Sequence, residues 1–219
     1  MNIFDRNFKE YEIWFEKNWI IFENEVNLLK SFIKNKKIGI EIGVGTGRFA
    51  QILGTKFGID ISLNMLRIAK MRGIEVLLAF GEKIPFKDET FDYATLIVTI
   101  CFLNDPKKVL NEINRIIKKD GKLYLAFIES ESKYGKYYEK LKENNVFYKE
   151  AKFYSSKQIK ELLQDSKFEV VRWAQTLFNE PGVQIKEKWE SGNDKGSFIV
   201  VEAKKLTQRA GSPLDLARG

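Results

Sequence analysis

The chain of 219 residues contains no histidine and a single cysteine, Cys101. Without histidine there can be no Ser-His-Asp or Cys-His nucleophilic site and no histidine-ligated metal. One cysteine cannot form an intramolecular disulfide or a cysteine metal cluster. Because Cys101 stands in an apolar run, we expect a buried, inert thiol rather than a reactive one. Acid–base chemistry must come from Asp, Glu, Tyr, Lys or the substrate, and no metal site is predicted.

Long apolar runs are also missing, since no stretch approaches the roughly 20 residues needed to cross a bilayer. The start, MNIFDRNFKEYEIWFEKNW, lacks the basic stretch, apolar stretch and cleavage site of a signal peptide. We therefore expect no membrane partner and a cytoplasmic location. The content of 44% hydrophobic and 31% charged residues is typical of a folded domain, and the length suits one α/β domain.

The net charge of +7 is not gathered in one block, because Lys and Arg are scattered among acidic residues. A nucleic-acid partner usually requires a basic stripe on one element, so none is expected here. The nearest candidate is RIIKKDGK, residues 115–122, where a helix is expected to end and a strand to begin. Cations at a helix C-terminus complement its dipole, and we favour that role over a phosphate-binding patch.

Large apolar residues recur every three or four positions from Tyr11 to Ile33 and predict one amphipathic helix. Strands and helices then alternate. The expected strands cover residues 38–41, 57–60, 74–79, 91–99 and 122–128, and the expected helices cover residues 47–53, 62–71 and 106–120. Alternation of this kind implies βαβ units with right-handed crossovers and a parallel sheet.

Residues 129–154 interrupt this alternation and carry seven aromatic residues between Tyr134 and Tyr154. This insert follows the fifth strand, at the carboxyl edge where open α/β sheets bind ligands. We interpret it as a substrate cap, with a plain helical packing layer as the alternative.

The remaining elements close the domain. A helix capped by Ser155 or Ser156, two strands over residues 169–177 and 197–203, and a long loop over residues 179–195 are expected. We predict one domain over residues 1–205, with an N-terminal helical segment over residues 1–36. From Leu206 onward Lys and Ile give way to Arg, Ala, Gly and Pro, so we interpret residues 206–219 as a disordered tail or an expression remnant.

The informative motif is EIGVGTGRF, which begins at Glu41 directly after an expected strand. Its glycines, Gly43, Gly45 and Gly47, let the backbone turn sharply and approach a ligand without a Cβ clash. A dinucleotide fingerprint needs glycine where Arg48 stands, and no Gly-Lys-Ser/Thr of a P-loop follows. These absences disfavour a nicotinamide dehydrogenase. The carboxylate of Glu41 suits a positively charged ligand better than a pyrophosphate.

Asp60 supports the same class of ligand. It ends the second expected strand, in GIDIS, one βα unit after the glycine turn. A carboxylate there can accept both ribose hydroxyls of an adenosine moiety. The alternative is a helix cap before Ser62. S-adenosylmethionine carries an adenosine together with sulfonium and ammonium charges, so it fits both acidic residues.

Ordered motifs between Ile38 and Ile128 resemble those of class I S-adenosylmethionine-dependent methyltransferases, specifically the small-molecule, type 11 branch that includes quinone-biosynthesis enzymes. The motifs are EIGVGTGRFA, GIDIS, AFGEKIPFKDETFD, YATLIVTICFLNDP and LNEINRIIKKDGKLYL. The resemblance implies a doubly wound, mostly parallel, seven-stranded α/β sheet of the Rossmann-like kind. Its strand order would be 3-2-1-4-5-7-6, with helices on both faces and an aromatic helical cap.

The resemblance also implies which residues bind S-adenosylmethionine, the methyl donor, and its product S-adenosylhomocysteine. Glu41 and the three glycines would hold the methionine part, Asp60 would take the ribose, and Ile61 would pack against the adenine. The full set of candidate cofactor-binding residues is Tyr11, Glu41, Gly43, Gly45, Gly47, Asp60, Ile61, Phe80, Gly81, Glu82 and Thr99.

Gly81 and Glu82 would border the adenine edge, and Val98 or Thr99 would line the sulfonium side. Phe80 departs from the family pattern, because many members carry Asp or a similar polar residue there. A Phe cannot accept a hydrogen bond from the adenine amine, so stacking or backbone contacts would have to serve instead.

The segment YEIWFEKN resembles an N-terminal segment that folds over the cofactor in this branch. Tyr11, Trp14 and Phe15 are therefore candidates to line the site. The alternative is simple core packing of an amphipathic helix.

The sequence thus predicts methyl transfer from S-adenosylmethionine to a small-molecule acceptor by in-line displacement, in which the protein mainly positions the reactants. The acceptor and the oligomeric state are not specified. Glu129 is a candidate base, but solvation at a strand end explains it equally well, so no catalytic residue is assigned. The alternatives are a catalytically silent cofactor-binding or interaction protein with the same fold, or an RNA methyltransferase, which the positive charge motivates.

Overall fold

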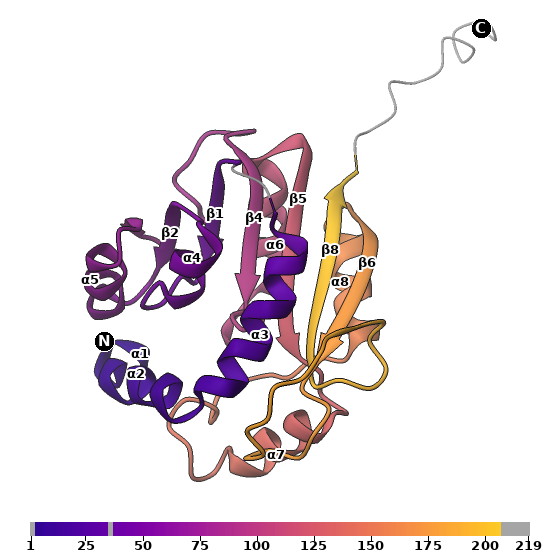
Figure 1. Ribbon diagram of the computed structural model, residues 1–219. Coiled ribbons are helices and arrows are strands. Elements are labelled where there is room, and N and C mark those ends of the chain that lie inside the picture. The colour runs from indigo at the N-terminus through magenta and orange to yellow at the C-terminus, as the bar shows by residue number, and fades with distance from the viewer. Residues whose placement is uncertain (1–2, 35–36, 207–219) are drawn as a thin grey trace, which may run out of the picture.

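An eight-stranded sheet runs through the part of the chain that the computed structural model describes, residues 3–34 and 37–206 (Figure 1). The tail predicted for residues 206–219 lies outside the described residues, except for Leu206. The elements are α1 (Ile3–Arg6), α2 (Phe8–Lys17), α3 (Trp19–Phe32), β1 (Gly39–Ile42), α4 (Arg48–Leu53), β2 (Phe57–Asp60), α5 (Leu63–Met71), β3 (Glu75–Leu78), β4 (Phe91–Ile97), the 3-10 helix η1 (Ile100–Phe102), α6 (Pro106–Ile116), β5 (Ile117–Ile128), α7 (Lys133–Leu141), α8 (Ser156–Asp165), β6 (Phe168–Thr176), β7 (Glu190–Ser191) and β8 (Phe198–Lys205).

The strands lie in the order β3-β2-β1-β4-β5-β8-β6-β7. The first five strands pair in parallel, whereas β8 runs antiparallel between β5 and β6. The expected order is confirmed, because the strand expected as the seventh is β8 and it inserts between the fifth and the sixth. The prediction of a continuous loop over residues 179–195 is wrong at Glu190–Ser191, because these residues form β7, which pairs with β6 at the sheet edge.

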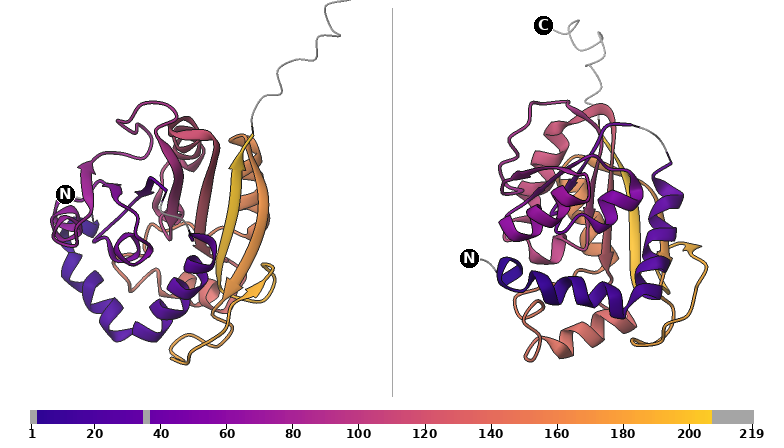
Figure 2. Two further views of the ribbon diagram at one scale, coloured as in Figure 1. Left: turned by 45° about the horizontal axis from the view of Figure 1, so that its top comes forward. Right: turned by 60° about the vertical axis from the view of Figure 1, so that its left-hand side comes forward.

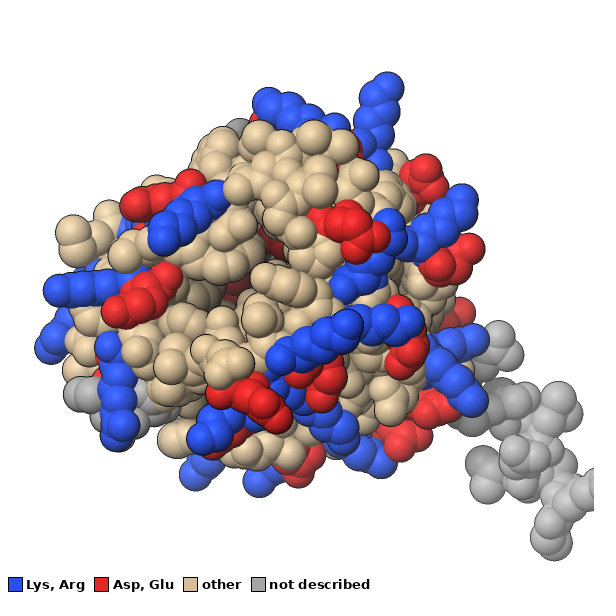
Figure 3. All heavy atoms as spheres, turned by 90° about the horizontal axis from the view of Figure 1, so that it is seen from below, with Lys and Arg blue, Asp and Glu red and all other residues tan. Residues whose placement is uncertain are grey.

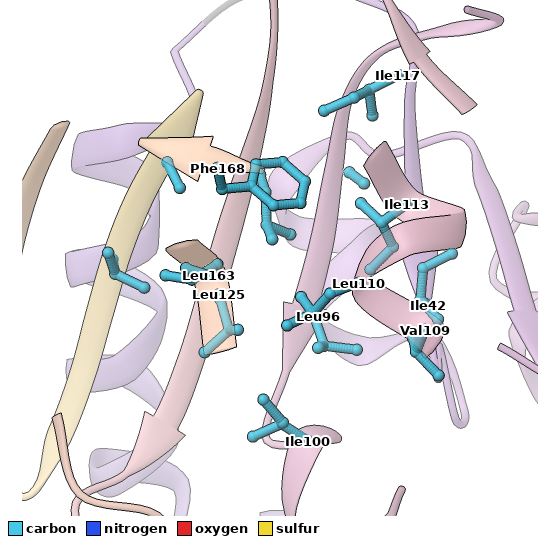
Figure 4. Packing of buried hydrophobic residues seen from close by; sticks show 14 of the residues in the cluster. Ile42, Leu96, Ile100, Val109, Leu110, Ile113, Ile117, Leu125, Leu163 and Phe168 are labelled. Atoms are coloured by element: carbon cyan, nitrogen blue, oxygen red, sulfur yellow. The ribbon is translucent and has the colours of Figure 1, made fainter. Parts of the chain in front are cut away.

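Helices cover both faces of the sheet, as predicted. In Figure 1, α3 lies in front of the strands, and α6 and α8 lie behind them. Figure 4 shows Val109, Leu110 and Ile113 of α6 packed beside Ile42 and Leu96 of the sheet, and all five side chains are buried. The Asp105 side chain caps α6 by accepting a hydrogen bond from the amide of Lys108, and Pro106 occupies its first turn.

The single helix predicted from Tyr11 to Ile33 is wrong, because the chain breaks into α2 and α3 at Asn18. The side-chain amide of Asn18 donates a hydrogen bond to the carbonyl oxygen of Trp14, at 2.8 Å. Side-chain hydrogen bonds of this kind compete with the helical ladder. The break lets α3 lie on the face of the sheet while α2 turns across the carboxyl ends of the strands.

The predicted boundary between the fourth helix and the fifth strand is also wrong. The helix was expected to end at Asp120-Gly121, but it ends at Ile116, and Ile117 begins β5. The carbonyl of Ile116 accepts a hydrogen bond from the amide of Thr90, and Ile117 pairs with Phe91. These long-range partners take the backbone groups that another helical turn would have used.

The basic stretch 115–122 therefore spans a helix end and a strand. Arg115 lies in the last turn of α6, as expected, but Lys118 and Lys122 lie on β5. Lys118 pairs with Asp92 at 2.8 Å, and Lys122 pairs with Glu202. These lysines pair with carboxylates on neighbouring strands and do not interact with the helix dipole.

The carboxyl ends of the parallel strands share one edge, at the bottom of Figure 1, and the N-terminal helices and the segment with α7 both lie there. Both views of Figure 2 show these two segments at the same end of the sheet. No helix in the described ranges is long and apolar enough to cross a membrane.

Candidate functional site

A cavity lies at this edge, between the strand ends, the N-terminal cover (residues 3–17) and the aromatic cap (residues 129–154). Figure 3 looks onto this end and shows a hollow surrounded mostly by uncharged atoms, with acidic atoms visible inside it. Nine of the eleven candidate cofactor-binding residues line the cavity: Tyr11, Gly43, Gly45, Asp60, Ile61, Phe80, Gly81, Glu82 and Thr99. Glu41 and Gly47 do not belong to its lining.

Glu41 lies on β1, just before the glycine turn in the chain, and its side chain is buried. Burial raises its pKa to about 8, the negative charge of Asp60 adds to this effect, and the Thr95 hydroxyl opposes it. Within the described ranges, Oε2 of Glu41 has no hydrogen-bond partner. A buried acceptor without a partner costs folding free energy unless a ligand donates a hydrogen bond to it. The position of this atom therefore favours a cationic or hydrogen-bond-donating ligand group here.

The glycine turn brings bare backbone to the cavity. Gly43 has a left-handed φ of +72°, and a Cβ there would lie 2.3 Å from the Cγ2 atom of Thr99. Asp60 holds the same turn, because its Oδ2 accepts a hydrogen bond from the amide of Gly45 at 2.9 Å. Its Oδ1 accepts one from the amide of Ser62 at 2.8 Å. Asp60 therefore organises the turn and the start of α5 while it also lines the cavity.

Gly47 has a different role from the other two glycines. It precedes α4 with a φ of +78°, and a Cβ there would lie 3.1 Å from the Cα atom of Ala69. It permits close packing of α4 on α5, so its assignment to the methionine part of the cofactor lacks a direct contact with the cavity.

We expect Gly47→Ala to lower the free energy of unfolding by about 2–3 kcal/mol, from left-handed strain and overpacking together. Gly54→Ala is the matched control, because Gly54 has a φ of +73° and open space around its Cβ position. The control should lose only about 1 kcal/mol, from strain alone. Urea unfolding measures both changes, and equal losses would contradict the packing role.

The N-terminal cover is fastened to the glycine turn by one carboxylate. Glu12 of α2 pairs with Arg48 at 2.7 Å and also with Arg72. Although burial opposes its ionisation, hydrogen bonds from Arg72 and Arg48 lower the pKa of Glu12 to about 2. The lowered pKa means that this attachment stabilises the fold above about pH 4.5 and is lost as the pH falls toward 2. At neutral pH the cover is held in place.

All three aromatic candidates of the cover, Tyr11, Trp14 and Phe15, line the cavity. Phe15 is also part of the core, so both interpretations hold for that residue. Burial and the charges of Glu41 and Asp60 raise the pKa of Tyr11 far above its ordinary range. Its phenol therefore stays protonated and can donate a hydrogen bond, but it cannot act as a base.

The fourth strand was expected to run to Thr99, but β4 ends at Ile97. Val98 then adopts a φ of +48°, which is strained for a β-branched residue, and its amide donates to the carbonyl of Ala126. The Thr99 hydroxyl donates to the carbonyl of Ile97 at 3.0 Å and lies 3.4 Å from that of Gly43. Both Val98 and Thr99 line the cavity beside the glycine turn.

The region assigned to adenine is open and apolar. Ile61 and Phe80 line the cavity, with exposed fractions of 44% and 66%. Large apolar side chains exposed at the edge of a cavity can receive a flat ring. Gly81 and Glu82 lie next to them in the lining, so the fold brings the candidate adenine residues together.

The aromatic cap combines both roles that were considered for it. Tyr138, Phe147, Tyr148 and Phe153 line the cavity, whereas Tyr154 packs into the core on the other face of the sheet. The cap and the cover also meet. Phe147 stacks on Phe4 of the cover, with ring centroids 5.5 Å apart.

Two residues that could carry reactive groups, Glu129 and Cys101, have structural roles. Glu129 is not part of the cavity lining; its Oε2 accepts from the amide of Glu131 at 2.7 Å, and its Oε1 accepts from that of Ser156. Cys101 is buried, as expected, and burial raises the pKa of its thiol to about 12. Neither group is placed to act as a base at neutral pH.

Glu25 is a further residue of the cavity, and it was not among the residues predicted from the sequence. This residue of α3 is 4% exposed and lines the cavity. A signal for it was available, because a carboxylate stands here between Phe22 and Val26 in the apolar stripe of an amphipathic helix.

Comparisons with known proteins identify the family of the chain. A family model described as "Methyltransferase domain" matches residues 40–125. An uncharacterised protein of Methanocaldococcus jannaschii is 41% identical over 206 residues, which are 94% of this chain and 100% of that protein. An uncharacterised protein of Mycobacterium tuberculosis is 33% identical over 182 residues, which are 81% of this chain and 64% of that protein.

A solved structure from Thermotoga maritima shares 41% sequence identity and superposes with a TM-score of 0.89, covering 93% of this chain and 98% of that chain. It is described as an S-adenosylmethionine-dependent methyltransferase and a possible histamine N-methyltransferase. With identity and coverage of this extent, the chain belongs to the class I S-adenosylmethionine-dependent methyltransferase family, whose members use that molecule as methyl donor.

Proposed function

We propose that this protein transfers a methyl group from S-adenosylmethionine to a small-molecule acceptor by in-line displacement. The observation that carries the proposal is the glycine turn that Asp60 holds at the cavity, next to the buried Glu41 carboxylate, whose Oε2 lacks a partner within the described ranges. These two hydrogen-bond acceptors match a nucleoside that bears an ammonium group.

Glu41 would accept hydrogen bonds from the ammonium group of the methyl donor. Asp60 would accept hydrogen bonds from the ribose hydroxyls, using the lone pairs that are not engaged by the amides of Gly45 and Ser62. S-adenosylmethionine supplies a methyl group on a positively charged sulfur, which makes the methyl carbon electrophilic. Thr99 and its neighbour Val98 would lie on the sulfonium side.

Ile61 and Phe80 would cover the two faces or edges of the adenine by apolar contact, because Phe80 offers no acceptor for the adenine amine. Gly81 and Glu82 would border the ring with backbone and carboxylate groups. This arrangement assigns the adenine by shape and stacking rather than by a side-chain hydrogen bond.

The N-terminal cover and the aromatic cap would exclude water from the reacting atoms. They meet above the cavity, where Phe4 contacts both Phe147 and Phe102. A positioned acceptor in a closed, mostly apolar space gains rate from proximity and orientation. The closure also favours a small acceptor over an RNA, because a folded nucleic acid cannot enter behind two packed segments.

Calorimetric titration tests the cofactor assignment. We expect S-adenosylhomocysteine to bind at one site per chain and NAD to show no binding, because the acidic lining disfavours a pyrophosphate. Binding of NAD, or no binding of S-adenosylhomocysteine, would contradict the proposal.

Turnover of a donor with a labelled methyl group then separates an enzyme from a catalytically silent binding protein of the same fold. The description of the Thermotoga maritima relative supports including histamine in the acceptor panel. A steep salt dependence of RNA binding would favour the RNA methyltransferase alternative instead.

A further inference from the structure

Glu25 is a buried acid for which the cofactor assignments have no use. It lies on α3 and lines the cavity. Within residues 3–34 and 37–206, no hydrogen bond or ion pair engages its carboxylate, and burial alone raises its pKa to about 8. Burying an acid without a partner costs folding free energy. Its position therefore points to a ligand that supplies the missing partner.

The surroundings of Glu25 are aromatic. Tyr138 stacks on Tyr148 with ring centroids 4.5 Å apart, and the ring of Phe153 lies 6.2 Å from that of Tyr138. Glu25, Tyr138 and Tyr148 all line the same cavity. After burial, the charge of Glu25 contributes to raising the pKa of both phenols. A carboxylate and electron-rich ring faces attract the same kind of ligand, a cation.

The charges of the cavity narrow the choice of ligand. Its described lining contains three acidic residues, Glu25, Asp60 and Glu82, and neither Lys nor Arg. Asp60 and Glu82 belong to the side assigned to the methyl donor, which leaves Glu25 for the acceptor. An anionic acceptor would be repelled there, and a neutral alcohol would leave the carboxylate without a counter-charge.

We propose that Glu25 binds the ammonium group of a small amine acceptor and accepts its proton before methyl transfer. The proposal rests on the proposed function and names its acceptor class, an amine whose organic part fits among Tyr138, Tyr148 and Phe153. A proton passes from the ammonium nitrogen to a Glu25 oxygen, which leaves a neutral amine and a carboxylic acid. The phenols cannot take this role, because their raised pKa keeps them protonated.

The remaining step balances without another reactant. The lone pair of the amine nitrogen forms a bond to the methyl carbon, while the bond from that carbon to sulfur breaks and its electron pair stays on sulfur. The product amine carries the positive charge and the new methyl group. Glu25 then returns its proton to the solvent as the product leaves.

Titration of the full chain saturated with S-adenosylhomocysteine tests the assignment. The probes are 2-phenylethylamine, histamine, and 2-phenylethanol as the neutral match of the first. We expect the amines to bind at least tenfold more tightly than the alcohol. Glu25→Gln should remove this difference by weakening both amines at least tenfold, while its affinity for S-adenosylhomocysteine stays within twofold. Gln is the isostere of the protonated acid, so the variant should fold, and Glu25→Asp should keep part of the preference.

Glu23→Gln is the matched control, because Glu23 lies on the same helix, pairs with Lys186 and is not part of the cavity lining. It should leave all affinities unchanged. The proposal is overturned if no amine binds to the loaded protein, if the alcohol binds as well as the amine, or if Glu25→Gln keeps the amine preference. Equal weakening of S-adenosylhomocysteine and amine would place Glu25 on the donor and also overturn it. Failure of S-adenosylhomocysteine to bind to the unmodified protein would instead refute the proposed function.

Discussion

Asp60→Ala should lower the affinity for S-adenosylhomocysteine about 100-fold, equivalent to roughly 2.7 kcal/mol of binding free energy. The variant loses the acceptor assigned to the ribose hydroxyls, and hydrogen bonds to a charged group contribute about 1.5–3 kcal/mol each. It also releases the amide of Gly45, which Asp60 holds at 2.9 Å. Calorimetry measures the affinity, and circular dichroism shows whether the fold survives, as we expect.

Two controls separate ribose contact from loop order. Asp92→Ala removes an equal charge at the start of β4, where Asp92 bonds to Ile38 and Lys118, and should leave the affinity unchanged. The 2′-deoxy analogue of S-adenosylhomocysteine should bind to the natural protein more weakly than S-adenosylhomocysteine itself does. The two ligands should bind equally well to Asp60→Ala, because that variant has no carboxylate to contact the 2′-hydroxyl. An additive loss for ligand and protein changes would show that Asp60 acts only through the turn.

Affinity for S-adenosylhomocysteine should rise nearly tenfold from pH 6 to pH 7 and about fivefold more from pH 7 to pH 8, about 50-fold in all, as the ionised fraction of Glu41 grows. The pKa of Glu41 is raised to about 8, chiefly by burial, whereas an ammonium group needs the ionised carboxylate. Binding therefore expels a proton from Glu41 below that pKa, which costs affinity. Glu41→Gln should bind about 100-fold more weakly at pH 8 and lose most of this pH dependence.

The control ligand is 5′-methylthioadenosine, which lacks the ammonium group. Its affinity should respond much less to pH and to Glu41→Gln. Stability without ligand should change in the opposite direction. The unfolded carboxyl of Glu41 ionises near pH 4.5 while the folded one resists ionisation up to about 8, so the natural fold loses stability over this range as the pH rises. At pH 8 the unligated Glu41→Gln protein should therefore be at least as stable. A pH-independent affinity for S-adenosylhomocysteine would remove Glu41 from the ammonium site.

Much of the sheet could be predicted from local pattern, because strands such as β1 and β2 are short apolar runs directly followed by turn or cap residues. The break at Asn18 and the early end of α6 at Ile116 could not. At Asn18 a side-chain hydrogen bond to the carbonyl of Trp14 competes with the helical ladder. At Ile116 the carbonyl is taken by the amide of Thr90, a partner distant in sequence. Local propensity does not contain such competition.

The candidate site shows the same division. The motif predicted a turn at Gly43, Gly45 and Gly47, and all three glycines do have positive φ. Only the fold shows that Gly47 faces α5. Glu25 was overlooked because an isolated acid in an apolar stripe has no meaning until the opposite wall of the cavity is known. That wall comes from a segment more than 100 residues away in the chain.

The position of β8 has a consequence for synthesis on the ribosome. β8 is the last strand in chain order, yet it fills the gap between β5 and β6 with hydrogen bonds on both sides. Until residues 198–205 have emerged, a nascent chain can present two unpaired strand edges, which are sites of aggregation. The domain can therefore nucleate early around β1, β2 and β4, but it can seal its sheet only late in translation, and a ribosome stalled shortly before Phe198 should hold a chain that depends on chaperones.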